Sequence, residues 1–480
     1  MSWEIIMGIE VHVELSTKTK AFCSCTTQFG GDANTHCCPI CTGMPGTLPV
    51  LNKKVLEYAI KSGLALNCSI TQYNKFDRKN YFYPDLPKAY QISQLYLPFA
   101  QNGSIDITTK NGDKKTIRIH EIHMEEDAGK LTHIAEKGIS YADYNRCGVP
   151  LLEIVSEPDF RSSDEVIAYL EKLKSTFEYL EISDCKMQEG SMRADVNLSV
   201  RKVGETEFGT RTEMKNIGSF KAIEKAIEYE SKRQIEAIEN GEEIIQETRR
   251  WDEALGKSIS MRSKENAQDY RYFPEPDIPP IYISDEMINE IKSTLPEMAE
   301  TKKEKYINHY GLSEYDANII TSNKTLAKLF EETNSYCNEP KEVANWILGQ
   351  VLYLAGNKNL EYEEIKISPK VFADFVTVIA KGTVNRKTGR DIFEIVFDAD
   401  ETFDVNKYIA DNNLAMVNDD GAAKEIVKQV IEQNPQSVED FKAGKTRVVG
   451  FLIGQCMKAL KGKGNPETLS KLVNEELSKL

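Results

Sequence analysis

The sequence predicts an α+β protein whose first half is built on antiparallel strands and whose second half is helical. Three observations lead to this prediction. Alternating apolar and polar residues recur up to about residue 280, a proline-rich segment follows at 274–284, and apolar residues at helical spacing dominate the remainder. We expect three domains, at residues 1–290, 291–405 and 406–480.

Composition narrows the class of protein. The chain has 480 residues, 60 Lys and Arg against 75 Asp and Glu, a formal net charge of −15 and 40% hydrophobic residues, which is typical of a soluble folded chain. No apolar run approaches the roughly 18–20 residues that cross a bilayer. Glu4, Glu10 and Glu14 exclude a secretory signal at the start. Ten scattered cysteines fit reduced thiols, so we expect a cytoplasmic protein with no membrane partner.

The first half contains three clear strands and two clear helices. The strands are GIEVHVEL, KTIRIHEIHME and MRADVNLSV, in which apolar residues alternate with polar ones. One helix begins with a capping box at Ser162 and Glu165, and the other ends at Asn240-Gly241, a pair that favours a left-handed cap.

The second half reads as helices joined by short polar segments. Residues 285–359 are helix-like throughout, with joints at 311–313 and 338–340. The acidic stretch 398–418 is expected to connect two small helical modules. The last helix should begin at Asn465-Pro466, a cap followed by a first-turn proline.

Acidic residues and histidines gather on the polar faces of the predicted strands. In GIEVHVEL, Glu10, His12 and Glu14 share one face, because successive side chains of a strand point to opposite sides. The simplest interpretation of this strand alone is a solvated sheet face. Further groups of the same kind make a site more plausible: Glu121, His123 and Glu125 on one strand, Arg193 and Asp195 on another, and Glu153 inside the apolar run LLEIV.

Carboxylates gathered on one surface repel one another, and a divalent cation would relieve that repulsion. Oxygen-rich ligands with one or two histidines suit Mg²⁺ or Mn²⁺ that holds phosphate oxygens. Basic residues near these segments in the sequence could neutralise a transferring phosphoryl group: Arg78, Lys79, Lys88, Lys130 and Arg193. No GxxxxGK[ST] motif is present, so any nucleotide site is not a P-loop.

Four cysteines have the spacing of a structural zinc site. Cys23-x-Cys25 and Cys38-x2-Cys41 form two knuckles twelve residues apart. The alternatives are unrelated buried thiols, or a redox pair at 38–41. The redox alternative is weaker, because Pro39-Ile40 lies in a loop rich in glycine and proline rather than at the start of a helix.

Longer motifs resemble a known family. They are GIEVHVEL, FDRKNYFYPDLPKAYQISQ, MEEDAGK, DYNRCGVPLLEIVSEPD, MQEGSMRADVNLSV, QETRRWDE and DYRYFPEPDIPP, with FKAGKTRVVGFLIGQCMKALKGKGNP near the end. In these motifs the sequence resembles the B subunit of the bacterial aspartyl/glutamyl-tRNA amidotransferase. The resemblance covers nearly the full length.

The resemblance implies a cradle-shaped antiparallel sheet domain followed by a helical domain and a small helical tail module. It implies that ATP phosphorylates the side-chain carboxylate of Glu-tRNA(Gln) or Asp-tRNA(Asn), and that ammonia then displaces the phosphate. By the resemblance, the catalytic and magnesium-binding residues are Glu10, His12, Glu125 and Glu153. The further candidates for cofactor contact or for the polar ammonia route are Lys79, Lys88, Arg193 and Asp195.

The chain lacks a recognisable means of releasing ammonia from glutamine, since no amidase-type Ser-Ser-Lys signature or Cys-His pair stands out. The resemblance therefore implies two partners, which are an amidase, the A subunit, and a small C subunit. Two other hypotheses stay open. The chain could be a non-catalytic scaffold that presents tRNA, with the acidic cluster serving structure only, or a free-standing ligase that acts on a small carboxylic acid.

The segment 441–466 contains six basic residues and no acidic one, in a chain that is acidic overall. The simplest explanation is an ordinary charged face of a small helical module. The functional hypothesis is contact with tRNA phosphates, which are recognised by backbone and shape more than by base identity. The candidate tRNA-binding residues are Lys445, Arg447, Lys458, Lys461 and Lys463.

Overall fold

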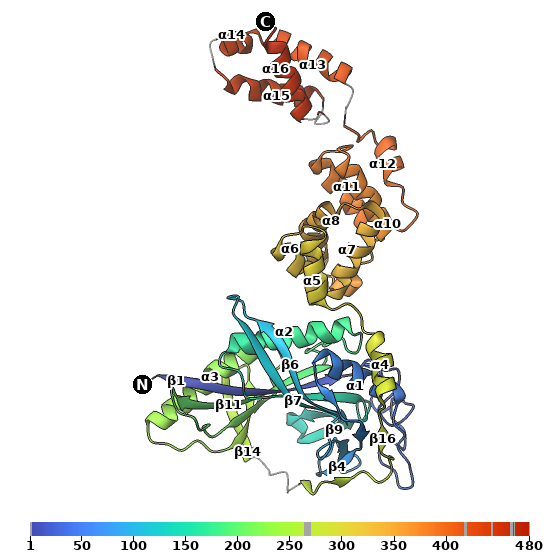
Figure 1. Cartoon of the computed structure of the whole chain (residues 1–480), viewed down its shortest axis with the longest axis vertical. Coiled ribbons are helices and arrows are strands. Elements are labelled where there is room, and N and C mark those ends of the chain that lie inside the picture. Colours follow the sequence, from blue (N-terminus) through green and yellow to red (C-terminus); the bar gives the residue numbers. More distant parts are fainter. Residues whose placement is uncertain are drawn as a thin grey trace. The chain divides into compact units, whose positions relative to one another are not determined.

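The structure is a computed structural model that describes residues 2–263, 270–416, 420–442, 445–460, 464 and 466–479 (Figure 1). The chain divides into two compact units, Met1–Met298 and Ala299–Leu480. Strands lie in the first unit and helices make up the second, which confirms the predicted α+β class. The predicted domain limits at 290/291 and 405/406 remain predictions.

A nine-stranded sheet forms the centre of the first unit, in the order β14-β13-β12-β11-β1-β10-β7-β6-β2. Its strands are β1 Trp3–Glu14, β2 Ser69–Ile70, β6 Ala100–Thr108, β7 Lys114–Glu126, β10 Pro150–Ser156, β11 Met192–Lys202, β12 Thr212–Lys215, β13 Glu247–Asp252 and β14 Lys257–Ser263. The pairing is antiparallel as expected except between β12 and β13, which run parallel. A helix connects these two strands, and a crossover of that length allows the parallel arrangement.

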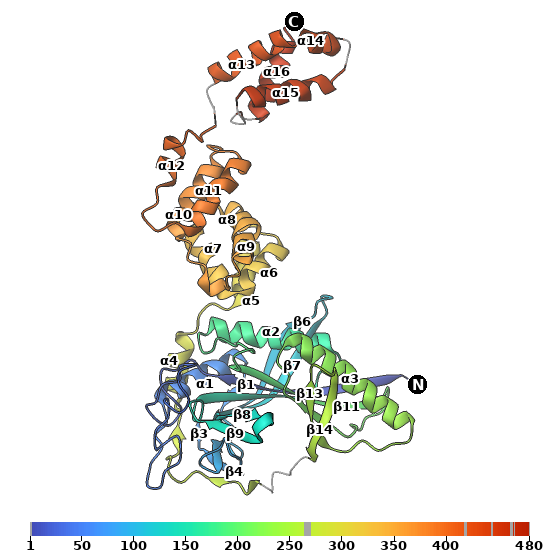
Figure 2. The same ribbon diagram turned by 180° about the vertical axis from the view of Figure 1, so that it is seen from behind.

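Helices cover one face of this sheet. Figures 1 and 2 show α2 (Ser163–Tyr179) and α3 (Phe220–Glu239) lying along it, and α1 (Lys53–Ala65) packs into the same core. The alternate apolar residues of β1 are buried in that core. As predicted, Ser162 caps α2 by accepting a hydrogen bond from the backbone N–H of Glu165, and Gly241 follows α3 with φ +81°. The other face of the sheet is left to polar side chains.

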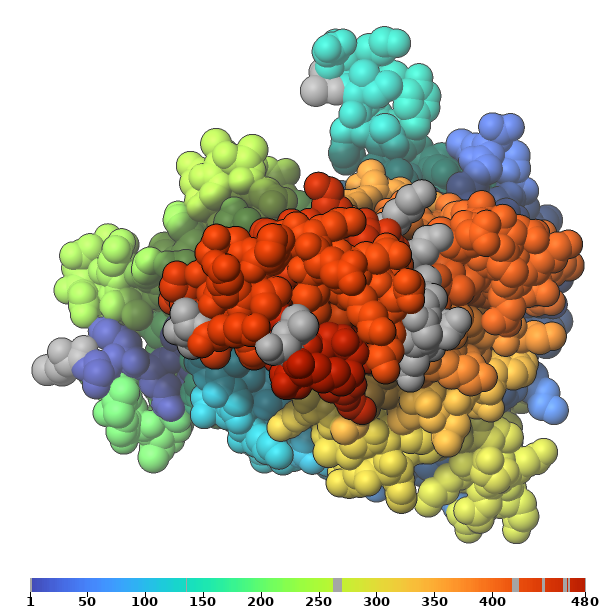
Figure 3. Space-filling view, turned by 90° about the horizontal axis from the view of Figure 1, so that it is seen from above, coloured from blue at the N-terminus to red at the C-terminus, as the bar shows by residue number. Residues whose placement is uncertain are grey.

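Smaller strands add to the first unit. They are β3 Tyr73–Asn74 with β16 Ile281–Tyr282, β4 Asp77–Asn80 between β5 Tyr90–Ser93 and β15 Phe273–Pro274, and the hairpin of β8 Lys130–Ile134 and β9 Ile139–Asp143. This hairpin is the turquoise projection in Figure 3. Helix α4 (Asp285–Ser293) ends the unit and contacts α1.

The second unit contains two separate apolar clusters. The first is formed by α5 Ala299–Asn308, α6 Glu314–Ser322, α7 Lys324–Cys337, α8 Pro340–Trp346, α9 Leu352–Asn357, α10 Pro369–Ala380, α11 Arg386–Asp398 and α12 Val405–Asp411, with a π-helical turn at Ile347–Val351. The second is formed by α13 Asp420–Gln433, α14 Pro435–Lys442, α15 Arg447–Ala459 and α16 Pro466–Leu477. Among the described residues, none of the helices has the length and apolar character needed to span a membrane.

One sequence-based expectation in this unit needs correction. The stretch 398–418, expected to be only a polar connection, contains α12. Val405 and Ile409 lie four residues apart, on one side of that helix, and are buried in the first cluster. The predicted last helix begins at Pro466, as expected, while Asn465 lies outside the described residues.

Candidate functional site

Strand β1 carries the centre of the site, because it lies in the middle of the sheet with polar side chains on the uncovered face. His12 pairs with Glu153 of β10 on one side and with Arg193 of β11 on the other. Glu10, two residues away on the same face, pairs with Asp195 of β11. Segments that are distant in the sequence thus meet at β1, as the alternating patterns predicted.

Strand β7 reaches the site through a change of register. The pairing of β7 with β10 shifts between Val155 and Ser156, which marks a β-bulge. Before the bulge, the odd-numbered residues of β7 up to Ile119 face the apolar core. After the bulge, the even-numbered residues from Ile122 onward face that core. The bulge therefore turns the odd-numbered side chains after it, Glu125 among them, toward the polar face.

His12, Glu125 and Glu153 form a first cluster, with one ligand atom from each lying within 4.8 Å of the others. His12 Nε2 is 3.5 Å from Glu125 Oε1 and 3.7 Å from Glu153 Oε1. Burial and the neighbouring Glu153 raise the pKa of the Glu125 carboxyl. Burial also acts to raise the pKa of Glu153, but the charges of His12, His123 and Lys79 outweigh it and lower that pKa. The donor set of one imidazole and two carboxylates suits a hard divalent cation.

A second cluster adjoins the first on the other side of β1. Ligand atoms of Glu10, Asp195 and Glu213 lie within 4.8 Å of one another. The Lys215 ammonium neutralises part of their charge, with its Nζ 2.5 Å from Asp195 Oδ2 and 3.3 Å from Glu213 Oε1. Asn197 donates a hydrogen bond of 2.8 Å to Glu10 Oε1. Burial, and then the charge of Glu153 in the first cluster, raises the pKa of Glu10, so the two clusters influence each other.

Sequence reasoning missed Glu213 and Lys215. The signal was present in the short segment TEMK, where Glu and Lys alternate with Thr212 and Met214. Those two alternate residues face the covered side, because Thr212 contacts Glu230 of α3 and Met214 joins the apolar core. Four residues are too few for alternation alone to indicate a strand and its two faces.

Both clusters border a pocket of about 930 Å³. Its lining includes Glu10, His12, Glu153, Glu213 and Lys215, together with Lys79, Asp85, Thr248, Arg271 and the aromatic residues Tyr81, Phe82, Tyr83 and Tyr270. The pocket therefore has an acidic wall, formed by the sheet, and an aromatic wall that carries cations.

Lys79 is the predicted basic residue that reaches this pocket. Burial acts to lower the pKa of Lys79, but the neighbouring Tyr272, Glu153 and Glu125 outweigh burial and raise it. Lys79 therefore keeps its proton and its positive charge. Its Nζ also lies 5.0 Å from the centre of the Tyr270 ring, which is a cation–π contact.

Two other predicted residues lie away from the pocket. The Lys88 ammonium is hydrogen-bonded to Glu126, and both side chains are buried beside a smaller cavity of about 190 Å³. Arg193 Nη2 lies 2.8 Å from Asp127 Oδ2 and lines a separate pocket of about 770 Å³. Asp195 lines that second pocket as well as joining the Glu10 cluster.

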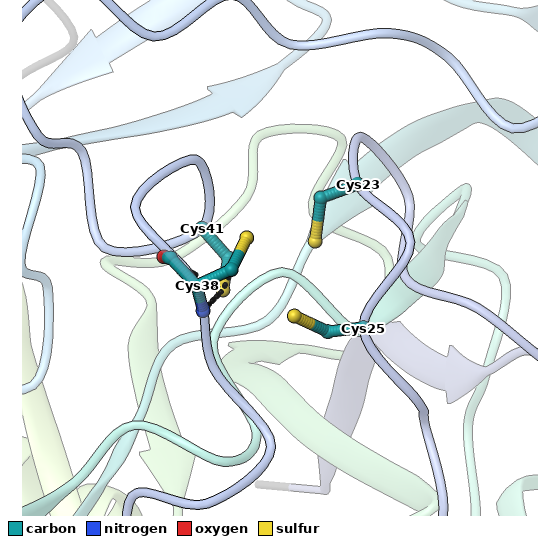
Figure 4. A group of neighbouring side chains, drawn as sticks. All are labelled: Cys23, Cys25, Cys38 and Cys41. Carbon is teal, nitrogen blue, oxygen red and sulfur yellow. Dashed lines mark hydrogen bonds between the residues drawn. The ribbon is translucent and has the colours of Figure 1, made fainter.

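The four predicted zinc cysteines converge. Their sulfur atoms lie within 4.8 Å of one another, and Figure 4 shows the side chains of Cys23, Cys25, Cys38 and Cys41 pointing toward a common centre. Cys38 N–H donates a hydrogen bond of 3.2 Å to Cys41 Sγ. A hydrogen bond from Cys23 is the main reason that the pKa of the Cys41 thiol falls to about 5. This cluster could hold a metal ion, and four sulfurs in this arrangement suit tetrahedral zinc.

The predicted tRNA-binding residues are described only in part. Lys445, Arg447 and Lys458 are exposed on or just before α15, while Lys461 and Lys463 lie outside the described residues. Lys445 Nζ lies 2.9 Å from Asp440 Oδ1, so part of its charge is already balanced.

Together these features define an α+β protein with additional helical modules. On the open face of its largely antiparallel sheet lies an acidic pocket whose carboxylates and histidine could hold a cation. The sequence matches the family described as "GatB/GatE catalytic domain" over residues 5–289 and the one described as "GatB domain" over residues 328–477. The chain belongs to the family of the B subunit of aspartyl/glutamyl-tRNA(Asn/Gln) amidotransferase, which confirms the resemblance.

Individual relatives agree with this assignment along the whole chain. Each of them is named as the B subunit of aspartyl/glutamyl-tRNA(Asn/Gln) amidotransferase. The protein of Lachnoclostridium phytofermentans is 59% identical over 99% of both chains, and that of Lachnospira eligens is 57% identical, also over 99% of both. The corresponding protein of Caldicellulosiruptor bescii is 55% identical over 100% of both chains.

Proposed function

We propose that this chain is the component of a tRNA-dependent amidotransferase that uses ATP to activate the side-chain carboxylate of Glu-tRNA(Gln) or Asp-tRNA(Asn) and then forms the amide. Family membership supports the general activity. The observation that carries the finer proposal is the pocket of about 930 Å³, where the clusters of His12 and Glu10 border the same space as Lys79 and Lys215.

The proposed reaction has two steps. The side-chain carboxylate attacks the γ-phosphorus of ATP, and ADP leaves, which converts a poor leaving group into phosphate. Ammonia then attacks the acyl carbon, phosphate leaves with the electrons of the broken C–O bond, and the nitrogen loses a proton. The first step requires that two anions, ATP and the side-chain carboxylate, approach each other, and nearby cations offset their repulsion.

The residues of the pocket divide into two roles under this proposal. Glu10, His12, Glu125 and Glu153 would hold Mg²⁺, with Asp195 next to Glu10. Bound Mg²⁺ would supply positive charge to the phosphate oxygens. Lys79 and Lys215 keep their charge beside these carboxylates and are placed to neutralise an incoming phosphoryl group.

The proposal includes partners and a route for ammonia. An amidase partner, the A subunit, would release ammonia from glutamine, and a small C subunit would complete the complex. Lys79 and Lys88 are proposed to line the polar path of ammonia, although the structure has Lys88 against Glu126 rather than at the pocket. The aromatic wall of Tyr81, Phe82 and Tyr270 would shield the activated acyl group from water.

The experiment that tests the proposal uses the reconstituted complex with and without misacylated tRNA. Glu125→Gln keeps the shape of the side chain but removes its charge from the first cluster. We expect tRNA-dependent phosphate release and amide formation to fall by at least about 100-fold, in line with the loss of a group that stabilises transition-state charge. Glutaminase activity of the partner should be retained.

Glu205→Gln, at an exposed position near the end of β11, is the matched control and should leave both activities unchanged. If amidation persists in the Glu125→Gln complex, the site assignment is wrong. The scaffold hypothesis predicts a different result, namely a loss of thermal stability without a selective loss of amidation.

A further inference from the structure

Lys20 lies next to the four-cysteine cluster and is completely buried, with a relative exposure of 0%. Its Nζ donates a hydrogen bond to Cys41 Sγ at 3.7 Å. Among the described residues, Cys41 Sγ is the hydrogen-bond acceptor found for the Lys20 ammonium. No carboxylate of the described residues lies within ion-pair distance of Lys20 Nζ. A buried ammonium is costly unless an anion compensates it.

The carboxylate of Glu126, which shares a cavity with Lys20, is engaged by other donors. Glu126 borders the same cavity of about 190 Å³ as Lys20 and Cys41. Its Oε1 accepts hydrogen bonds from Lys88 Nζ and from the backbone N–H of Ile92. The sulfur of Cys41 is therefore the hydrogen-bonded partner of the Lys20 ammonium.

Thiolates are the anions that a metal-bound cysteine cluster supplies. Four thiolates around a divalent cation have a net charge of −2, and the buried ammonium at Cys41 reduces that charge. We propose that Lys20 is a supporting residue of the four-cysteine metal centre, and that its positive charge stabilises the metal-bound thiolates and raises the affinity of the cluster for Zn²⁺.

The local packing is consistent with this role. Gly148, at φ +82°, leaves room beside both groups, because a Cβ there would come within 3.3 Å of Cys41 Cβ and 3.6 Å of Lys20 Cδ. The backbone N–H of Ala21 donates a hydrogen bond of 2.8 Å to the Gly148 carbonyl. Gly148 lies just before β10, the strand that carries Glu153. Short contacts therefore connect Lys20 and the cysteine cluster to this strand.

The test measures zinc affinity of the full-length chain by competition with a chelator of known affinity. Lys20→Met keeps most of the volume and removes the charge, and Lys20→Gln keeps a hydrogen-bond donor without the charge. Both variants should bind Zn²⁺ about 10–100-fold more weakly, the range typical of lost partners of metal ligands. Lys18→Met, two residues away at an exposed position, should bind Zn²⁺ like the unmodified chain.

A second measurement separates metal support from general packing. With Zn²⁺ in excess, Lys20→Met should lower the unfolding temperature. After the metal is removed, the same change should lower it less, because the cluster then holds fewer thiolates than the four that a bound metal requires. Equal zinc affinity in Lys20→Met and the unmodified chain would overturn the proposal. So would an equal loss of unfolding temperature with and without metal, or an unmodified chain that binds no zinc.

Discussion

Glu125 and Glu153 lie on adjacent strands and both contact His12, yet the pKa values of their carboxyl groups shift in opposite directions. Burial acts on both, and the charges of His12, His123 and Lys79 favour the ionised form of each; Lys215 acts in addition on Glu153, whereas the charge of Glu153 opposes ionisation of Glu125. Glu125 is left with the larger repulsion. The proposed cation, bound between the two carboxylates, would reduce their mutual repulsion.

One prediction concerns Lys215, a residue of the site that was not identified from the sequence. Lys215→Met removes the ammonium that lies between Asp195 and Glu213, and leaves three carboxylates within 4.8 Å. We expect tRNA-dependent ATP hydrolysis in the reconstituted complex to fall at least about 10-fold, since a cation placed to neutralise the proposed phosphoryl group is lost.

Lys202→Met is the control, because Lys202 is exposed at the end of the neighbouring strand β11. The steady-state rate at saturating ATP and tRNA is the measurement for both variants. An unchanged rate in Lys215→Met would mean that this ammonium only balances the charges of its neighbours.

Alternation predicted the residues of the site on strands better than those in loops. Glu10, His12 and Asp195 could be assigned to one face because each lies in a strand with regular apolar partners. Lys88 lies in a loop, where the sequence does not indicate the direction of a side chain, and the structure has it against Glu126. Motif proximity alone could not distinguish its position from that of Lys79.

At the scale of elements, the bulge in β7 shows what an alternating pattern cannot predict. The pattern of KTIRIHEIHME predicts a strand, and β7 confirms it. The point at which the strand changes its buried side depends on pairing with β10, which is not visible in one sequence. The parallel pair of β12 and β13 was missed for the same reason, since pairing partners are set by the whole sheet.

Helix α3 is held to the sheet by a buried carboxylate. Glu230 is fully buried, and its oxygens accept hydrogen bonds from Arg233, Ser258 and Thr212. Burial acts to raise the pKa of Glu230, but the hydrogen bonds, above all that from Arg233, outweigh it and lower the pKa. This carboxylate therefore connects α3 to β12 and β14.

Glu230→Gln should lower the free energy of unfolding of the chain by about 1–3 kcal/mol, because a charged acceptor of buried hydrogen bonds is lost and the part-buried Arg233 loses its counter-ion. The contribution has a defined pH dependence. A lowered folded-state pKa stabilises the fold above the ordinary glutamate pKa of about 4.3, and this stabilisation is lost as the pH falls through the lowered value. The difference between the two proteins in urea unfolding should therefore shrink below about pH 4.

Glu228→Gln on the same helix is the matched control, since Glu228 is exposed and pairs only with Lys232 among the described contacts. It should leave the free energy of unfolding essentially unchanged, because an exposed ion pair contributes little in water. A difference between Glu230→Gln and the unmodified chain that does not vary with pH would contradict the assignment of the charged form to Glu230.

At the scale of the whole molecule, separate apolar cores correspond to separate tasks in the proposed reaction. The first unit contains the pocket and the cysteine cluster, and the last four helices have a core of their own. The helical character of the second half was predictable from its 3.6-residue periodicity. Helix α12 was not, because its seven residues span only about two turns, which is too short for the periodicity to be recognised.

The basic residues near α15 provide a prediction for the complete complex. Arg447→Glu combined with Lys458→Glu should weaken tRNA binding and reduce its salt dependence. The slope of log affinity against log salt should fall by roughly 0.7–0.9 for each phosphate that the protein no longer neutralises. Filter binding over a salt series is the measurement.

Lys424→Glu combined with Lys428→Glu, on α13, changes the net charge by the same amount at exposed positions of the same four-helix module. This control should bind tRNA more tightly than the double variant in α15. Equal weakening by both pairs would indicate a general charge effect, and no weakening by the α15 pair would exclude these residues from tRNA contact.

The pocket beside His12 and Glu10 is the proposed place where the side-chain carboxylate is activated by phosphorylation. The most direct measurement follows oxygen-18 from the side-chain carboxylate of misacylated tRNA during amide formation by the reconstituted complex. We expect labelled oxygen to appear in the released phosphate, and Glu125→Gln to abolish this transfer. Amide formation with unlabelled phosphate, or unchanged transfer in Glu125→Gln, would contradict phosphorylation of the carboxylate in this pocket.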